Sequence, residues 1–236
     1  LKPVSMIPDP YGCHGSYGEH MSSLLREAME ELGVEHEFKR AYDLYGSGAL
    51  APYIEKILLN WQVIGEKIEE MTGQGKYLRI LPYFPICEEC ERIYTTEAIS
   101  YDKRTKKVHY VCRGTEIKGK EFRGCGHEGE VDVRGRNGKL VWKVEFAARW
   151  ALLKVRFEAY GKDLEDSVKV NDWVSEHVLG WVPPYHVRYE MFLDRLGRKI
   201  SKSAGNVFTP QLWLRYGSKE SLLLYLLQRF HSTRRI

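Results

Sequence analysis

Four of the five cysteines lie between residues 87 and 125, and their spacing constrains the fold more than any other feature of the sequence. Cys87 and Cys90 are separated by two residues, the spacing of a turn that can bind one zinc ion with two thiolates. Cys112 and Cys125 would complete a tetrahedral site of four thiolates. The pattern predicts a zinc ribbon.

The second half of this pattern leaves the fourth ligand open. Twelve residues rich in Lys, Gly and Glu separate Cys112 from Cys125, where a compact zinc knuckle has about two to four. His127 lies two residues beyond Cys125 and is an alternative ligand. Short strands are expected at residues 92–99 and 107–111. An odd number of cysteines without secretory features argues against a disulfide framework, and the alternative to a metal site is a group of reduced cysteines.

A second group of metal-ligand residues lies near the N-terminus. It offers one carboxylate, one thiolate and two imidazoles, from Asp9, Cys13, His14 and His20. Ser16 and Glu19 have the spacing of a capping box, which predicts a helix that continues to Leu32. A loop folded over the first turn of this helix would fill all four positions of a structural zinc site. The spacing alone favours a metal no more than a set of satisfied polar loop residues.

The sequence Lys199-Ile-Ser-Lys-Ser203, the KISKS segment, carries two lysines between Gly197 and Gly205. Two ammonium groups in one loop can bind the phosphates of a nucleotide and stabilise charge that develops on a leaving pyrophosphate. The alternative is a solvated basic loop. Gly161 and Asp163 follow an expected strand, at the edge where open parallel sheets bind ligands. Because both features fall on one sheet edge, we expect a nucleotide site there.

The chain divides into three expected parts: catalytic-domain and connecting segments at 1–77, a β-rich metal-binding insertion at 78–142, and further α/β structure at 143–236. The fold class is therefore α/β with a small β-rich insertion. The other expected strands are 4–7, 35–38, 155–160 and 187–193, and the expected helices are 16–32, 51–72, 146–153, 164–179 and 222–230. Thr209-Pro210 and Ser218 are predicted helix starts.

Composition and charge limit the class of protein and its location, but they say little about its chemistry. The 236 residues carry a formal net charge of +4, and the C-terminal residues around Arg234 and Arg235 are locally basic, which gives weak support for contact with nucleic acid. No segment has the apolar length of a membrane helix. The chain begins without methionine or a signal sequence, so we expect a piece of a longer, cytoplasmic protein.

Taken together, these motifs resemble those of the class I lysyl-tRNA synthetases of archaea and some bacteria. The resemblance runs nearly end to end, through PDPYGCHGSYGEH, ICEEC, CGHEGEVDV, KVEFAARWALLKVRFEAYGKDL, VRYEMFLD and KISKSAGN. It implies a Rossmann-like catalytic domain, here partial, that is interrupted by a zinc-ribbon insertion. It also implies activation of lysine with ATP and Mg²⁺, followed by transfer to tRNA(Lys).

The resemblance also implies roles for individual residues. Lys199 and Lys202 would stabilise the triphosphate and the departing pyrophosphate. The ATP site would comprise Gly161, Asp163, Lys199, Ser201 and Lys202, with Asp163 on the ribose hydroxyls. Phe146 and Tyr189 match positions of lysine recognition, although Phe146 stands where many members have tryptophan, and both also suit ordinary core packing. The two sets Asp9, Cys13, His14, His20 and Cys87, Cys90, Cys112, Cys125 would hold two zinc ions.

Some family features are missing from the sequence. None of the eight histidines stands in the His-x-Gly-His arrangement that contacts ATP, and the anticodon-binding region expected after Ile236 is absent. We therefore expect a fragment that is inactive or nearly so by itself. The alternatives are a zinc-ribbon module that binds nucleic acid and a synthetase-like protein without catalysis. Glu145 is a candidate for the lysine-binding acid by its proximity in sequence.

Overall fold

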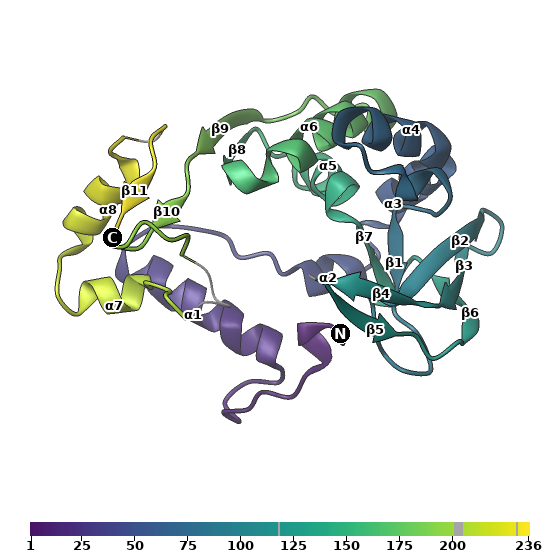
Figure 1. Cartoon of the computed structure of the whole chain (residues 1–236), viewed down its shortest axis with the longest axis horizontal. Helices are drawn as coiled ribbons and strands as arrows, with labels where there is room; N and C mark the ends of the chain where they lie inside the picture. The colour runs from purple at the N-terminus through teal and green to yellow at the C-terminus, as the bar shows by residue number, and fades with distance from the viewer. Residues whose placement is uncertain (118, 201–204, 230) are drawn as a thin grey trace.

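The computed structural model describes residues 1–117, 119–200, 205–229 and 231–236, and Figure 1 shows the arrangement of the elements. Ser201 and Lys202 of the predicted ATP site lie outside the described residues. Within the described residues, helices and small sheets confirm the mixed α/β class. None of the helices in this part of the chain is both long and apolar enough to cross a membrane.

The segment around the cysteines is built from short antiparallel strands. Its main sheet is three-stranded, and the other strands form a separate hairpin and a pair at the base. The bounds are β1 Tyr83–Pro85, β2 Thr96–Asp102, β3 Lys107–Cys112, β4 Gly114–Ile117, β5 Lys120–Arg123, β6 Glu128–Asp132 and β7 Gly138–Leu140. Tyr83 in β1 lies opposite Leu140 in β7, so the segment leaves and rejoins the rest of the chain at one place. The domain limits at 78 and 142 stay a prediction.

The expected long helix at 51–72 is two helices, α3 (Ala51–Leu59) and α4 (Trp61–Thr72). The chain breaks at Asn60, whose backbone leaves the helical region with φ −110° and ψ 19°. The apolar spacing is nevertheless correct for both halves, because Ile54, Ile57, Leu58, Ile64 and Ile68 are all buried. Periodicity shows which side chains enter the core, and a one-residue break leaves it nearly unchanged.

A β–α–β unit follows the segment of short antiparallel strands. It consists of β8 (Phe157–Gly161), α6 (Glu165–Val174) with a continuing π-helical turn (Ser175–Leu179), and β9 (Tyr185–Tyr189), and the two strands are parallel. A short 3₁₀ turn, Lys162–Leu164, joins β8 to α6. This parallel sheet has two strands among the described residues, so the Rossmann-like domain is supported only at the level of a mixed α/β unit.

Helix α5 (Trp142–Leu153) packs on α6 through a buried side-chain amide. Asn171 of α6 accepts a hydrogen bond from the N–H of Ala147 at 2.8 Å and donates to the carbonyl of Trp142 at 2.8 Å. Both bonds satisfy polar groups away from water, where an unpaired group is costly. The pair of helices is thereby fixed behind the two parallel strands.

The N-terminal segment differs most from expectation. The strand expected at 4–7 is a 3₁₀ turn, Val4–Met6, and residues 35–38 are extended without forming a strand in the described structure. The apolar residues in both segments are partly exposed, and an extended segment becomes a strand only when a neighbour pairs with it. The predicted helix is present as α1 (Tyr17–Glu31), with Ser16 Oγ accepting from the N–H of Glu19 at 3.2 Å. A short helix, α2 (Ala41–Gly46), follows.

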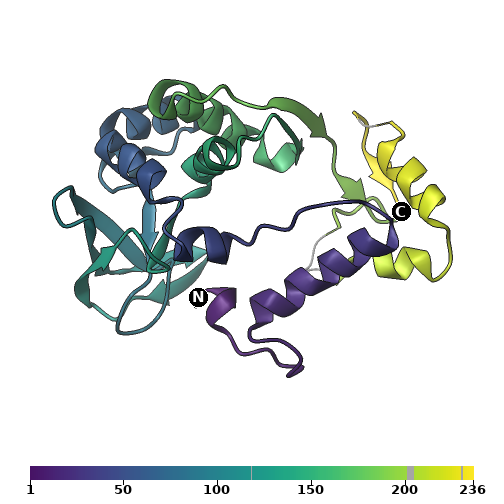
Figure 2. The ribbon, with the colours of Figure 1, turned by 180° about the vertical axis from the view of Figure 1, so that it is seen from behind.

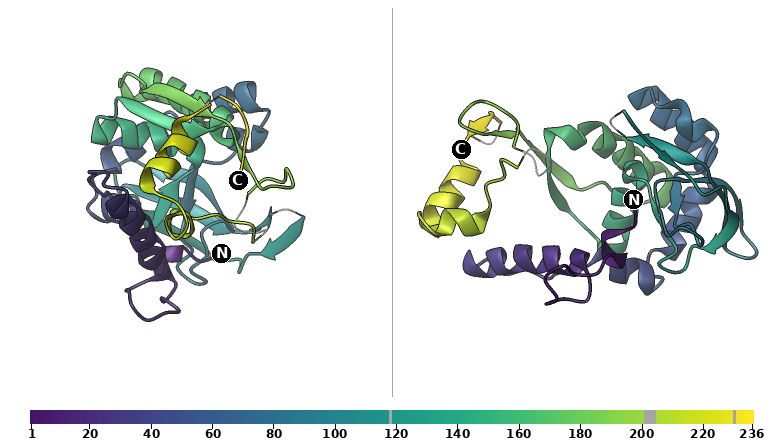
Figure 3. Two further views of the ribbon diagram at one scale, coloured as in Figure 1. Left: turned by 90° about the vertical axis from the view of Figure 1, so that its left-hand side faces the viewer. Right: turned by 60° about the horizontal axis from the view of Figure 1, so that its bottom comes forward.

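The C-terminal elements form a small separate lobe, seen from behind in Figure 2 and from two further directions in Figure 3. The expected strand at 187–193 is divided between β9 and β10 (Phe192–Leu193), and β10 pairs in parallel with β11 (Arg234–Arg235). Helices α7 (Pro210–Leu214) and α8 (Lys219–Leu227) begin at the predicted caps. The lobe contacts α1, because the Gln211 amide donates to the carbonyl of Leu24 at 2.7 Å.

The basic C-terminal end is not uniformly a surface. Arg234 is only 8% exposed, and its guanidinium carbon lies 4.4 Å from the centre of the Phe192 ring. Its Nη1 donates to the carbonyl groups of Tyr225, Leu226 and Gln228 at the end of α8. A cation at this end satisfies carbonyls that have no partner inside the helix. Arg234 is therefore a helix cap and does not contribute to an exposed basic surface.

Gly65 in α4 provides a test of the packing. A Cβ atom at this position would lie 2.2 Å from the carbonyl oxygen of Tyr77, which is backbone and cannot move aside as a side chain does. Helix propensity alone favours alanine by about 1 kcal/mol. Because the clash dominates, we expect Gly65→Ala to lower the free energy of unfolding by about 1–3 kcal/mol in urea denaturation. Gly75→Ala, which meets a flexible Glu69 side chain, is the control; a stabilised Gly65→Ala variant would contradict the packing.

Candidate functional site

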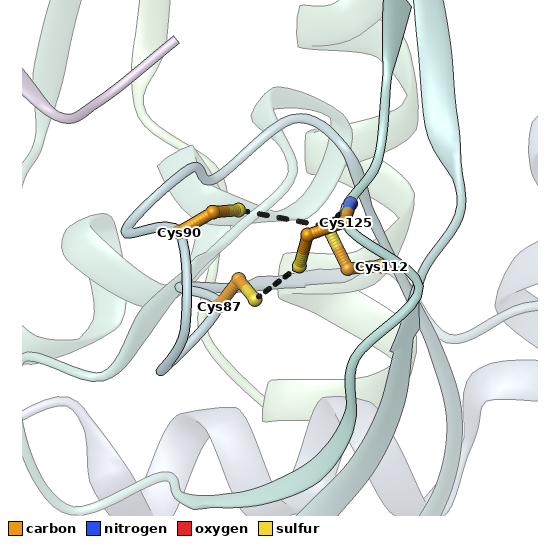
Figure 4. Close-up of side chains that lie close together, drawn as sticks. All are labelled: Cys87, Cys90, Cys112 and Cys125. Carbon is orange, nitrogen blue, oxygen red and sulfur yellow. Dashed lines mark hydrogen bonds between the residues drawn. The ribbon is translucent and has the colours of Figure 1, made fainter.

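The four clustered cysteines converge from three separate segments of chain (Figure 4). Cys87 and Cys90 lie in the turn after β1, Cys112 ends β3, and Cys125 follows β5. The four sulfur atoms all lie within 4.8 Å of one another, with 3.5 Å between Cys87 and Cys125 and 3.8 Å between Cys90 and Cys112. Tetrahedral zinc with bonds of about 2.3 Å places sulfur atoms about 3.8 Å apart. The residues present therefore fit a zinc ion.

The thiols depend on a cation to ionise together. Burial acts to raise the pKa of Cys87, but the N–H groups of Cys90 and Glu89 outweigh it and the pKa is lowered. Burial, together with the neighbouring thiols, raises the pKa of Cys90 to about 12. Four thiolates at these distances would repel one another strongly. A bound divalent cation would supply the charge that allows all four to deprotonate.

The long excursion between Cys112 and Cys125 is the β4–β5 hairpin. It leaves and returns beside the cluster, with Gly114 opposite Arg123. Gly124 is required next to the cluster, because a Cβ there would lie 2.0 Å from the carbonyl oxygen of Cys112. His127 accepts from the N–H of Cys112 through its carbonyl, while its Nε2 lies 3.9 Å from Glu88 Oε2. The sulfur cluster thus contains Cys125, and the imidazole of the alternative ligand His127 lies near Glu88 and Tyr110.

The N-terminal loop brings the second predicted set together. The ligand atoms of Asp9, Cys13, His14 and His20 lie within 4.8 Å of one another. The Cys13 sulfur is 3.1 Å from His14 Nδ1, 3.3 Å from His20 Nδ1 and 3.3 Å from Asp9 Oδ2. Helix α1 positions His20 in its first turn, and the loop before Ser16 carries the other three. This mixed donor set also fits tetrahedral zinc.

Backbone hydrogen bonds keep the Asp9 carboxylate ionised. Burial acts against the charge, but the N–H groups of Tyr11, Cys13 and His14 donate to the carboxylate, and the pKa falls to about 2. Burial and the Asp9 carboxylate together raise the pKa of the Cys13 thiol. The loop therefore presents a fixed anion beside a thiol that needs a cation to ionise.

The predicted nucleotide residues meet at the carboxyl ends of the parallel strands. Gly161 ends β8 and lies opposite Tyr189 at the end of β9. A Cβ on Gly161 would lie 3.0 Å from Asp163 Oδ1 and 3.3 Å from the Tyr189 ring. The ammonium group of Lys199 lies 3.2 Å from Asp163 Oδ2. Four residues proposed from the sequence, separated by up to 38 positions, therefore share one edge of the sheet.

Phe146 and Glu145 lie on α5. The ring contacts of Phe146 are with Trp142 and Trp150 of the same helix, at centroid distances of 5.4 and 6.3 Å, and the side chain packs on the hydrophobic core. Glu145 is 3% exposed, and its carboxylate accepts from Tyr45 Oη at 3.2 Å and Arg149 Nη2 at 3.0 Å. Since Tyr45 and Arg149 already occupy this carboxylate, Glu145 connects α5 to α2 and is not the lysine-binding acid considered above.

Sequence reasoning missed Asp194 and Asn206, which flank the KISKS segment. The Asp194 carboxylate accepts from the N–H groups of Leu196 and Arg198, from Arg198 Nε, and from Asn206 Nδ2, at 2.8 to 3.1 Å. Gly197 adopts a φ of +79° in the turn. The signal in the sequence was Asp194 three residues before Gly197, a turn pattern that does not reveal which distant side chain the carboxylate binds.

The sequence matches one known protein family over its whole length. The family model described as tRNA synthetases class I (K) matches residues 1–236, which is the whole chain. The chain belongs to this family of class I tRNA synthetases. Both cysteine-containing clusters and the Asp163–Lys199 edge therefore lie within a class I synthetase sequence.

Individual relatives agree with the family assignment. A lysine–tRNA ligase of Cenarchaeum symbiosum is 57% identical over 235 residues, covering 100% of this chain and 45% of the relative. Lysine–tRNA ligases of Rickettsia felis and Archaeoglobus fulgidus are 32% and 34% identical over 96% and 88% of the chain, and 41% and 40% of their own lengths. The chain spans less than half the length of these curated relatives.

The pKa of Asp194 predicts how the turn of this class I synthetase responds to acid. Hydrogen bonding from Arg198, partly offset by burial and assisted by Asn206 and Leu196, lowers the pKa from 3.8 to about 2. The carboxylate therefore stabilises the turn fully above about pH 4, and this contribution disappears as the pH falls from 3.8 through about 2. We expect the carboxyl ¹³C shift of Asp194 to show a mostly ionised group at pH 3. Asn206→Ala should raise the midpoint, and a wild-type midpoint near 3.8 would contradict the hydrogen bonding.

Metal analysis tests both clusters independently. We expect about two zinc ions per chain, because each set offers four protein ligands. Cys90→Ser should remove the metal of the cysteine cluster and leave the other, and Cys13→Ser should do the reverse. Elemental analysis of the purified variants, with circular dichroism to confirm that they fold, gives the stoichiometry. One zinc ion per chain in the wild type, with no loss in Cys13→Ser, would show that the N-terminal set is a polar loop without metal.

Proposed function

We propose that this chain forms part of the catalytic domain of a lysine–tRNA ligase, which activates lysine with ATP and transfers it to tRNA(Lys). The observation that carries the proposal is the meeting of Gly161, Asp163, Tyr189 and Lys199 at one sheet edge. The names of the relatives supply the amino acid. A nucleic-acid-binding zinc module would leave this edge unexplained. The cytoplasm is the proposed setting.

The proposed chemistry is the attack of the lysine carboxylate on the α-phosphorus of ATP, with pyrophosphate as the leaving group. Such a step depends on positioning and on stabilising charge, without a general base. The Lys199 side chain is 53% exposed and that of Asp163 is 56% exposed, so their ion pair is solvated and weak. The ammonium can therefore exchange the carboxylate for a phosphate oxygen. Lys202 and Ser201 are proposed to act beside it, with Mg²⁺ entering as part of the nucleotide substrate.

Asp163 has a second part in this proposal. Once Lys199 moves to the phosphates, its carboxylate can accept hydrogen bonds from the ribose hydroxyl groups. Gly161 supports this role, because the space that a side chain there would fill is bounded by Asp163 and the Tyr189 ring. The ring of Tyr189 lies beside Gly161 and suits contact with the aliphatic part of a lysine substrate. Phe146, whose ring lies on α5, is the second proposed lysine contact.

The proposed metals have a structural role. Sites in which the protein fills all four positions leave no place for a reacting ligand. The cysteine cluster would join the β1 turn, β3 and the end of β5 in a zinc-ribbon insertion at 78–142. The N-terminal set would hold the loop of residues 9–15 against the start of α1. Neither ion is given a part in the reaction.

The remaining proposal concerns the sheet. Two-stranded sheets have limited stability by themselves, and β8 and β9 carry large rings at their first residues, Phe157 and Tyr185, which are 57% and 73% exposed. We assign these strands to a larger parallel sheet of the Rossmann type. The length of the relatives, more than twice that of the chain, supports this assignment.

Lysine-dependent exchange of pyrophosphate into ATP tests the proposal in the full-length protein that contains this chain. We expect exchange with lysine and little with arginine or ornithine. Lys199→Ala should lower kcat by about 100-fold, because it removes a cation aimed at the developing charge. Lys103→Ala, at an exposed turn between β2 and β3, is the matched control and should be unchanged. Absence of exchange with lysine, or equal exchange with another amino acid, would refute the proposal.

A further inference from the structure

Lys199 is anchored at the base of a tight turn. It forms an isolated antiparallel bridge with Leu193, and the N–H of Ile200 donates to the carbonyl of Phe192 at 3.2 Å. The N–H of Asp194 donates to the carbonyl of Arg198 at 2.8 Å. The position of the Lys199 backbone is thus set by β10 and by the turn that begins at Asp194.

The Asp194 carboxylate is the centre of this turn. Its side chain is 15% exposed, and it receives two backbone N–H groups and the Arg198 guanidinium on one side. A carboxylate that accepts several donors in this way holds a turn more firmly than backbone bonds alone, because its charge strengthens each bond. Residues 194–198 are thereby organised before the first lysine of the KISKS segment.

Asn206 connects this turn to the other side of the segment. Its Nδ2 donates to Asp194 Oδ2 at 3.1 Å and to the carbonyl oxygen of Lys199 at 3.2 Å. An amide nitrogen carries two hydrogens, so both can be used at once. One side chain therefore fixes the carboxylate that orders the turn and the backbone of the lysine that follows it.

Anchoring matters for Lys199 because its side chain is long and about half exposed. Fixing the backbone at the carbonyl limits the volume that the ammonium group can sample. The ammonium then reaches Asp163 in the 3₁₀ turn after β8, 36 residues earlier in the chain. Order that exists before the nucleotide binds does not have to be created during the reaction.

We propose that Asp194 and Asn206 are positioning residues, which hold Lys199 where it can stabilise the reacting phosphates. The inference rests on the proposed function for what Lys199 does, whereas the clamp itself is independent of it. Neither residue touches the substrate in this proposal. Their effect on the reaction must therefore pass through Lys199.

A double-mutant cycle in the full-length protein tests this transmission. In lysine-dependent ATP–pyrophosphate exchange, we expect Asn206→Ala to lower kcat by about tenfold and Lys199→Ala by about 100-fold. The double variant should be no worse than Lys199→Ala within about twofold, because the clamp has nothing left to position. Multiplication of the two losses, to about 1,000-fold, or an unchanged Asn206→Ala variant would overturn the proposal.

Amide hydrogen exchange of the chain itself provides the second measurement. We expect peptides covering residues 192–200 to exchange at least about tenfold faster in Asn206→Ala than in the wild type. Asn137→Ala is the matched control, since this amide donates to the carbonyl of Asp132 in the turn between β6 and β7. Equal exchange in Asn206→Ala and the wild type would overturn the clamp. If the wild type lacks ATP–pyrophosphate exchange, the proposed function fails, and the amide exchange still decides whether Asn206 holds Lys199.

Discussion

The convergence of four cysteine sulfurs is the constraint on which the β-rich segment of the structure depends. The sheets there have two or three short strands, and small sheets bury little apolar area. Cys87 and Cys112 are both fully buried and belong to the same hydrophobic core as Leu140, Val144 and Trp150. These cysteines therefore connect the β-rich segment to the helices of the same core. Loss of the sulfur cluster would therefore destabilise α5 as well as the strands.

The structure treats its acidic groups in two contrasting ways. Glu145 is buried with a tyrosine and an arginine as partners, so removing one partner would leave a charge without solvation. Asp163 forms one ion pair in solvent with Lys199. The first arrangement fixes α5 to α2, and the second can change partners at little cost. Burial therefore distinguishes Glu145, which has a structural role, from Asp163, which is suited to a substrate site.

Local chemistry in the sequence predicted much of this arrangement. The caps at Ser16, Thr209 and Ser218 depend on neighbouring residues alone, and all three are confirmed. The two ligand sets were found because metal-binding residue types cluster along the chain, and the structure brings each set together. Periodicity does not encode whether a segment finds a pairing neighbour, so it wrongly predicted strands at 4–7 and 35–38. It also missed the break at Asn60.

The same distinction explains why the Asp194–Asn206 pair was missed. Each residue looks like an ordinary turn residue in the sequence. Their joint role arises only because the Asn206 side chain donates to both Asp194 and the carbonyl of Lys199. Helix α1 extends this principle over a longer distance. It begins at the N-terminal ligand set and contacts Gln211 of the C-terminal lobe through Leu24. The loop that orders the first turn of α1 therefore also affects the position of the C-terminal lobe, through the contact between Leu24 and Gln211. Since β10 and Lys199 belong to that lobe, the geometry at the sheet edge depends on residues at both ends of the chain.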